Sequence, residues 1–221
     1  MLFLDKKYAI VTGYSSGIGK AICDLLKENS YKIICLKTRL EDTKALEIEI
    51  KDILKQCDIS LLINCAGIGI FQPHEEISIE KIKELIDINL TAPIVLTKLL
   101  LRSLKKTKGT IINISSIEAT KHSKFSALYT ATKSGLRDFS LCLFEELRKA
   151  DVKVASINPD ITKTNFFDDL QFEPSSQKDS YLDPFDVAQN VLVILNSNGT
   201  ITDLTIRAQK FAISKKNKNK N

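Results

Sequence analysis

Apolar segments of strand length alternate along this sequence with longer segments in which apolar residues recur at helical spacing. Residues 7–12 (KYAIVT) form the first short run, and residues 17–29 carry apolar side chains three and four positions apart. This alternation predicts a single α/β domain with a doubly wound parallel sheet and helices on both faces. We expect further strands at 32–36, 45–50, 60–64, 110–115, 152–158 and 202–207, and further helices at 82–101, 127–149 and 186–195.

The sequence shows no linker and no internal repeat, so residues 1–210 are predicted to form one domain. Residues 166–183 are polar and lack periodicity, and a long irregular segment in a compact domain is usually functional or mobile. We therefore interpret this segment as an active-site lid. Residues 211–221 are basic and end without apolar side chains, which predicts a disordered, solubilising tail.

Composition excludes several classes of protein. Apolar residues make up 43% of the 221 residues and charged residues 27%, as in soluble globular proteins. No window approaches the ~18 apolar residues of a membrane helix, and the N-terminus does not resemble a secretory signal, so we expect a cytoplasmic protein. The five scattered cysteines indicate neither a disulfide framework nor a zinc site. Much of the net charge of +5 lies in the tail, so we expect no nucleic-acid partner and no membrane.

A glycine-rich turn, residues 12–19 (TGYSSGIG), joins the first strand to the first helix. Glycines permit a tight turn and a close approach to a ligand, and a helix N-terminus offers free backbone N–H groups to a pyrophosphate. The motif alone also fits an ordinary turn. Its position between a strand and a helix favours dinucleotide binding.

Further motifs follow in a characteristic order. They are Asn64-Cys65-Ala66-Gly67 after a strand, Asn89 within a long helix, Ser115 at the end of a strand, Tyr129-Thr130-Ala131-Thr132-Lys133 on the next helix, and Asn158-Pro159. In this order and spacing the chain resembles the short-chain dehydrogenase/reductase family over residues 6–207. The resemblance implies a Rossmann fold and hydride transfer between a nicotinamide cofactor and a small alcohol or carbonyl substrate.

Tyr129 and Lys133 are the residues that point most directly to chemistry. Residues four apart share a helix face, so both side chains can reach one pocket. A neighbouring cation favours the phenolate and lowers the tyrosine pKa toward neutrality. By the resemblance, Tyr129 is the general acid/base, Lys133 lowers its pKa and binds the nicotinamide ribose, Ser115 holds the substrate oxygen, and Asn89 maintains a proton relay. Asn89 alone also fits a helix kink or a polar core contact.

The resemblance also implies a set of cofactor contacts. Tyr129 and Lys133 belong to this set as well as to the catalytic one. The other expected residues are Gly13, Ser15, Ser16, Gly17, Ile18 and Gly19 on the pyrophosphate side, Asn64, Ala66 and Gly67 near the adenosine ribose, and Pro159, Ile161 and Thr164 near the nicotinamide.

Departures from the family pattern are informative. Cys65 replaces the second asparagine of Asn-Asn-Ala-Gly, and Asp160 stands where glycine commonly follows the proline. The segment between Glu49 and Asn64 is short, so the acidic residue near adenine is either Glu49 or Asp52, and the following helix is expected only at 53–56.

Cofactor choice depends on the end of the second strand. A cation there receives the 2′-phosphate of NADP, whereas an acidic side chain accepts from the 2′-hydroxyl of NAD. Lys37 and Arg39 favour NADP, with NAD as the alternative.

Two other functions stay open at this point: a 3-oxoacyl-carrier-protein reductase with a basic patch at 121–124, and a cofactor-sensing protein without turnover. The resemblance favours a homodimer or homotetramer. Substrate choice is assigned to the lid and to residues 118–125, which carry no interpretable motif.

Overall fold

A computed structural model describes residues 7–216 of the chain. The helices and strands alternate as the apolar pattern predicts. In chain order they are β1 (Lys7–Val11), α1 (Gly17–Glu28), β2 (Tyr31–Ile34), α2 (Thr43–Leu54), β3 (Ile59–Asn64), α3 (Ile79–Ile86), α4 (Ala92–Thr107), β4 (Thr110–Ile114), α5 (Ala127–Leu147), β5 (Lys153–Pro159), β6 (Phe172–Pro174), α6 (Pro184–Asn196), β7 (Asp203–Ile206) and β8 (Ile213–Lys215).

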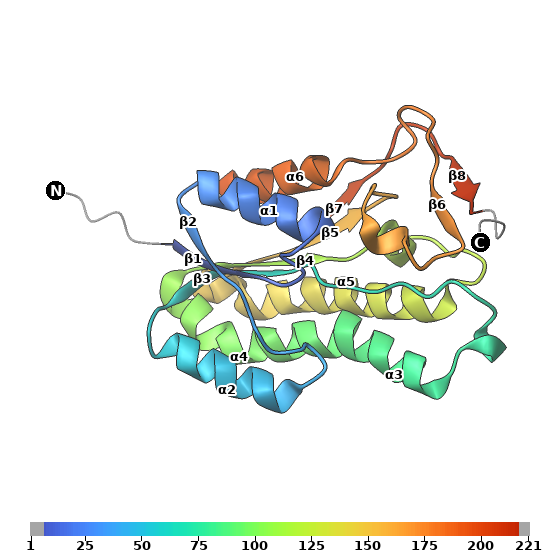
Figure 1. Ribbon diagram of the computed structural model, residues 1–221. Coiled ribbons are helices and arrows are strands. Elements are labelled where there is room, and N and C mark those ends of the chain that lie inside the picture. The colour runs from blue at the N-terminus through green and yellow to red at the C-terminus, as the bar shows by residue number, and fades with distance from the viewer. Residues whose placement is uncertain (1–6, 217–221) are drawn as a thin grey trace.

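Six of the strands form one parallel sheet in the order β2-β1-β3-β4-β5-β7. Helices α1 and α6 cover one face, and α2, α4 and α5 cover the other (Figure 1). Successive side chains of β1 enter different layers, because Ala9 and Val11 pack beneath α1 and α6 while Ile10 packs against α2 and α4. The predicted doubly wound α/β fold is therefore confirmed.

The strand expected at 45–50 is wrong, and so is the short helix expected at 53–56. Both segments belong to α2 or to the turn that follows it. Asp42 caps the helix by accepting from the backbone N–H of Ala45. Leu46 and Ile50, four residues apart, are buried, whereas Ile48 between them is 65% exposed. The apparent alternation thus comes from one exposed apolar residue on a helix.

The long helix expected at 82–101 is interrupted. Residues Asp87–Thr91 adopt a π-helix between α3 and α4, and Pro93 lies in the first turn of α4. Asn89 lies in this π-helical turn and is fully buried. Such turns occur frequently at functional sites.

The expected lid and the expected tail are paired with each other. Strand β6, inside the lid segment, runs antiparallel to β8 near the C-terminus (Figure 1). The Lys216 ammonium donates to the backbone carbonyls of Phe167 and Asp168. The prediction that disorder starts at residue 211 is therefore wrong for residues 211–216, and residues 217–221 lie outside the described part of the chain.

Candidate active site

The expected site residues gather at the carboxyl edge of the sheet, where β1 and β3 lie side by side. From β1 the chain leaves toward β2 on one side, and from β3 it leaves toward β4 on the other. Such a switch point opens a crevice in α/β sheets. The Thr12 hydroxyl joins its two walls, because it accepts from the backbone N–H groups of Cys65 and Ala66 at 3.0 Å each.

The glycine turn has the geometry that a dinucleotide requires. Gly13 and Gly17 adopt φ values of +69° and +51°, which side chains disfavour. A Cβ on Gly19 would lie 2.1 Å from the Gly13 carbonyl oxygen, so the turn closes only with glycine there. Ser15 and Ser16 are exposed, and in the described chain Ser16 makes no side-chain cap on α1. The first turn of α1, with Ile18, therefore keeps N–H groups for an anionic ligand, so the turn fits the diphosphate of a nicotinamide dinucleotide.

The loop after β2 carries the two cations expected to select NADP. Lys37 is exposed, and the Arg39 guanidinium forms an exposed ion pair with Glu41 at 2.8 Å. The Glu49 carboxylate fixes the loop by accepting from the backbone N–H groups of Lys37 and Thr38 at 2.8 and 3.0 Å. Glu49 is thus a structural cap in this structure, and Asp52 pairs with a lysine on the exposed end of α2. Neither acid is brought to the crevice as an adenine contact.

Tyr129 and Lys133 lie on the buried face of α5, as their spacing predicts. The Lys133 ammonium donates to the Ile114 carbonyl at 2.9 Å and lies 5.9 Å from the centre of the Tyr129 ring. Burial lowers the pKa of Lys133 to about 8.

Burial also dominates at Tyr129, and it raises the pKa of the hydroxyl well above its ordinary value. A hydrogen bond with Ser116 lowers this pKa in part, and the charge of Glu118 raises it further. Burial is thus the largest influence on the pKa of Tyr129 in this structure, and the lowering by Lys133 stays a prediction.

The two serines after β4 make different contacts. The Ser115 hydroxyl donates to the Lys133 carbonyl at 2.7 Å and is therefore used to hold α5 against the sheet. Ser116 lies close enough to the Tyr129 hydroxyl to lower its pKa. Its oxygen also accepts from the backbone N–H of Glu118 at 3.1 Å. The structure thus brings Ser116, and not Ser115, to the tyrosine.

Asn89 lies behind the lysine. Its amide exchanges two hydrogen bonds of 2.9 Å with the backbone of Ile68 and donates to Thr132 at 3.3 Å. A Cβ placed on Gly67 would lie 3.2 Å from the Lys133 ammonium and 3.3 Å from the Asn89 side-chain oxygen. Gly67 therefore leaves open the space where Asn89 and Lys133 converge.

Asn64 uses its amide group in a buried chain of hydrogen bonds. Its amide donates to Asn113 at 2.7 Å, and Asn113 donates to Ser140 on α5 at 2.8 Å. This buried chain ties β3 and β4 to α5. The neighbouring Cys65 is partly buried and packs against the core, and desolvation raises the pKa of its thiol to about 12.

The loop after β5 reaches the glycine turn. A Cβ on Gly17 would lie 3.0 Å from the Thr164 methyl group, so these two segments are in contact. Pro159 is buried at the end of β5, and the carbonyl of Ile161 accepts from the backbone N–H of Leu182 at the base of the lid segment. Asp160, the unusual residue of this loop, accepts from the Ile161 N–H at 3.0 Å and pairs with Arg207 at 3.4 Å.

Aromatic rings cover Tyr129, a feature that no sequence motif predicted. The rings of Phe71 and Phe166 lie 5.0 and 5.9 Å from the Tyr129 ring, centre to centre. Phe172 on β6 packs against Phe71 at 5.2 Å and against Phe167 at 5.7 Å. We call Phe71, Phe166, Phe167 and Phe172 the aromatic cover. A Cβ on Gly69 would lie 2.4 Å from the Phe166 ring, so this glycine makes room for the cover.

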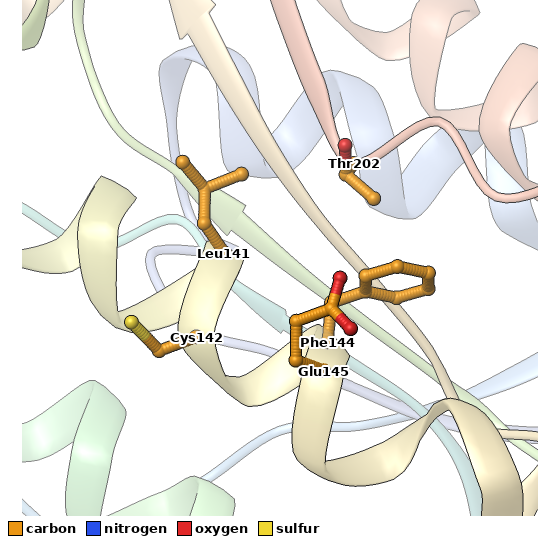
Figure 2. A pocket seen from close by; sticks show the side chains of 5 residues that line it. All are labelled: Leu141, Cys142, Phe144, Glu145 and Thr202. Carbon is orange, nitrogen blue, oxygen red and sulfur yellow. The ribbon is translucent and has the colours of Figure 1, made fainter.

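A separate hollow lies far along α5 from Tyr129. It is lined by Leu141, Cys142, Phe144, Glu145 and Thr202 (Figure 2). Thr202 precedes β7, so this hollow is at the opposite edge of the sheet from the crevice. Within residues 7–216, no group of three His, Cys, Asp or Glu side chains is arranged to hold a metal ion. The described helices include none with the length and apolarity needed to span a bilayer.

Comparison with known proteins identifies the family. The sequence model of the short chain dehydrogenases matches residues 7–60 and 55–174. The chain belongs to the short-chain dehydrogenase family. It is therefore an oxidoreductase, and it covers nearly the full length of its relatives. An uncharacterized oxidoreductase from Staphylococcus saprophyticus is 29% identical over 94% of this chain and 99% of its own. The carbonyl reductase family member 4 of Xenopus tropicalis is 32% identical over 86% of this chain and 92% of its own.

Solved structures share the fold of this short-chain dehydrogenase. An alcohol dehydrogenase from the archaeon Thermococcus sibiricus, complexed with 5-hydroxy-NADP, has a TM-score of 0.81 at 24% identity and covers 92% of this chain and 97% of its own. A 4-hydroxyisoleucine dehydrogenase complexed with NADH has a TM-score of 0.83 at 22% identity, and the match covers 91% of this chain and 97% of the dehydrogenase. One carries an NADP derivative and the other NADH, so the shared fold does not decide between the two cofactors.

Proposed function

We propose that this short-chain dehydrogenase transfers a hydride between a nicotinamide cofactor, NADP in preference to NAD, and a small alcohol or carbonyl compound. The placement of Tyr129 and Lys133 side by side on the buried face of α5, with Ser116 near the Tyr129 hydroxyl, supports the proposal. The cofactor supplies or takes up the hydride when bound, and the chain supplies the proton and holds the substrate oxygen.

In carbonyl reduction the hydroxyls of Tyr129 and Ser116 would both hold the substrate oxygen. Because its pKa is raised, Tyr129 is protonated at neutral pH and can donate its proton to that oxygen as the alkoxide forms. Ser116 would polarise the same oxygen with its own O–H, which takes over the role expected of Ser115. In alcohol oxidation Tyr129 would take the proton from the substrate hydroxyl, and the hydride would leave the substrate carbon for the cofactor.

The remaining residues would position the cofactor and the proton path. The Lys133 ammonium would hold the nicotinamide ribose, and Asn89 would keep the π-helical turn in place behind it. Gly13, Gly17 and Gly19 would hold the diphosphate at α1, and Thr164 would contact the nicotinamide end. Asn64 would act only through the strand that it braces.

Turnover of Tyr129→Phe tests the proposal directly. Purified wild-type protein should oxidise NADPH with members of a panel of ketones, aldehydes and keto acids, and Tyr129→Phe should lose at least about 10³-fold in kcat while NADPH fluorescence titrations stay unchanged. A variant that keeps full turnover would contradict the role of Tyr129. A wild-type protein that binds NADPH and turns over nothing would favour the cofactor-sensing alternative.

Arg39→Asp tests the preference for NADP. The exposed guanidinium would meet the 2′-phosphate, and an acid at that position would repel it. We expect NADPH to bind at least about tenfold more weakly to the variant and NADH to change by less than about threefold. Unchanged preference between NADPH and NADH would remove the assignment.

The carrier-protein alternative gains no support, because Lys121 of the expected basic patch is paired with Glu118 at 3.1 Å. Assembly as a homodimer or homotetramer and a cytoplasmic location stay predictions from the sequence.

A further inference from the structure

Glu118 is a buried carboxylate that the proposed chemistry does not use. It lies in the 3-10 turn Ile117–Ala119 after β4, two residues beyond Ser116, and is 8% exposed. One oxygen, Oε1, accepts from the Ser123 hydroxyl at 2.9 Å and pairs with the Lys121 ammonium at 3.1 Å. The other oxygen, Oε2, is buried, and no residue between 7 and 216 hydrogen-bonds it.

An anionic oxygen without a partner is a costly feature in a folded protein. Buried polar atoms are nearly always hydrogen-bonded, and each exception calls for an explanation. The cost of an unmet acceptor is greatest for charged groups. Lys121 balances the charge of Glu118 through Oε1 but leaves Oε2 with unused capacity as an acceptor.

The carboxylate belongs to the surroundings of the reacting groups. The Glu118 backbone N–H donates to the Ser116 oxygen at 3.1 Å, and Ser116 lies near the Tyr129 hydroxyl, whose pKa it lowers. The charge of Glu118 reaches the Tyr129 hydroxyl, since it raises the pKa of that group. The other neighbours of the Tyr129 ring include Phe71 and Phe166, which offer no acceptor.

We propose that Glu118 Oε2 accepts a hydrogen bond from a second donor on the substrate, a hydroxyl or an ammonium group next to the reacting CH–OH or carbonyl carbon. The substrate class is then a vicinal diol or amino alcohol, or the corresponding hydroxy or amino carbonyl compound. This inference rests on the proposed function and adds a specificity-determining residue to it. Ser116 and Tyr129 hold the reacting oxygen, the aromatic cover encloses the carbon skeleton, and Glu118 recognises the second polar group.

Two matched series of alcohols test this inference. In the first, 1-amino-2-propanol, 1,2-propanediol and 2-butanol differ only in an ammonium, hydroxyl or methyl group. In the second, 2-amino-1-phenylethanol, 1-phenyl-1,2-ethanediol and 1-phenyl-1-propanol differ in the same way. With NADP, wild-type kcat/KM should be about 10- to 100-fold higher for the ammonium and hydroxyl members of a series than for its methyl member, as one hydrogen bond to a charged group would give.

Glu118→Gln separates charge from hydrogen bonding. The amide oxygen still accepts, so the hydroxyl member should stay within about threefold of its wild-type kcat/KM, whereas the ammonium member should lose about tenfold or more. The methyl member is the reference for both values, because a change in the pKa of Tyr129 would affect all three members alike. Glu146→Gln, on the exposed side of α5, is the matched control and should leave all three values unchanged. Unaltered NADPH binding by Glu118→Gln, measured by fluorescence, would show that the variant is folded.

Several results would overturn the inference. Equal wild-type kcat/KM for the three members of both series would do so, and this measurement needs no variant. If the ratio of kcat/KM between the ammonium and methyl members is the same in Glu118→Gln as in the wild type, a residue other than Glu118 causes the preference. If the protein turns over the alcohols of both series at equal rates, only this inference fails. If it turns over no carbonyl or alcohol at all, the proposed function fails as well.

Discussion

Ser115 and Ser116 are adjacent residues that make different contacts. Successive side chains of extended chain point to opposite sides, so two adjacent serines at a strand end meet different surroundings. Ser115 bonds the Lys133 carbonyl on α5, and Ser116 lies near the catalytic tyrosine proposed above.

Alanine substitutions should separate the two serines. Ser116→Ala should lower kcat/KM about 10²-fold and leave stability unchanged, because it removes one donor to the substrate oxygen. Ser115→Ala should cost about 1 kcal/mol of unfolding free energy, because it removes a buried hydrogen bond. Steady-state kinetics and urea unfolding of both variants measure these effects. The opposite pattern would return the role to Ser115.

Lys133 gives stability a specific pH dependence. Its pKa falls from the ordinary 10.5 to about 8 on folding, because burial disfavours the ammonium. Between pH 8 and 10.5 the unfolded chain therefore binds more protons at this residue than the folded chain, so stability rises with pH in that window. The full effect is about 3 kcal/mol, which is the burial penalty that remains below pH 8.

Comparison with Lys133→Met isolates this contribution. Between pH 7 and pH 10.5, the unfolding free energy of the wild type should increase by about 3 kcal/mol relative to that of the variant. Urea unfolding at several pH values measures it. A difference that does not change with pH would show that Lys133 keeps an ordinary pKa in the folded protein.

Among single residues, spacing predicted that Tyr129 and Lys133 share one face of a helix, and the family resemblance added Asn89 behind them. Spacing did not predict which of the two serines lies near the tyrosine, because successive side chains in extended chain point to opposite sides. It also missed the aromatic cover and the unpaired oxygen of Glu118. Those features arise from contacts between segments far apart in the chain.

Among the elements, periodicity located the core strands and helices but failed where exposure departed from the usual pattern. In α2 the exposed Ile48 imitates the alternation of a strand, and only the packing of Leu46 and Ile50 on the sheet reveals a helix. Strand β8 had no periodic signal, because three residues are too few to show one. Its pairing with β6 decides its structure.

Strand β8 should matter for catalysis through the aromatic cover. It pairs with β6, which carries Phe172, and Lys216 bonds the carbonyls of Phe167 and Asp168. Deletion of residues 212–221 should loosen the cover, raise KM and lower kcat/KM about tenfold, with little change in NADPH binding. Deletion of residues 217–221 alone keeps β8 and is the control. Equal kinetics of the two truncated proteins would separate β8 from the site.

At the scale of the whole molecule, the alternation of elements was sufficient to predict the parallel sheet and its covered faces. Parallel strands need a connecting helix between them, and these helices cover the two faces of the sheet. Because such connections are right-handed, only a few strand orders are possible. The number of strands in the parallel sheet was overestimated by one, because the pattern of the segment that forms α2 was ambiguous. The crevice between β1 and β3 follows from the strand order.

The same topology predicts how cofactor binding affects the entire fold. A dinucleotide in the crevice would contact the turn after β1, the loop after β3 and the loop after β5, and so would stabilise the folded chain as a unit. At a concentration of about 100 times Kd, a ligand that binds only the folded state adds about 2.7 kcal/mol. For a chain of this size we expect NADPH to raise Tm by roughly 5–10 °C and NADH at the same concentration to raise it less.

Two variants make this thermal shift specific to the crevice. Tyr129→Phe should keep the full shift, because the hydroxyl acts on the substrate oxygen. Gly13→Val should lose it, because φ is +69° there and a Cβ would lie 3.0 Å from the Ala66 backbone. Thermal unfolding of the three proteins, with and without NADPH, measures the effect. A wild-type shift that Gly13→Val retains would place the nucleotide elsewhere, since the turn after β1 would then not be part of its binding site.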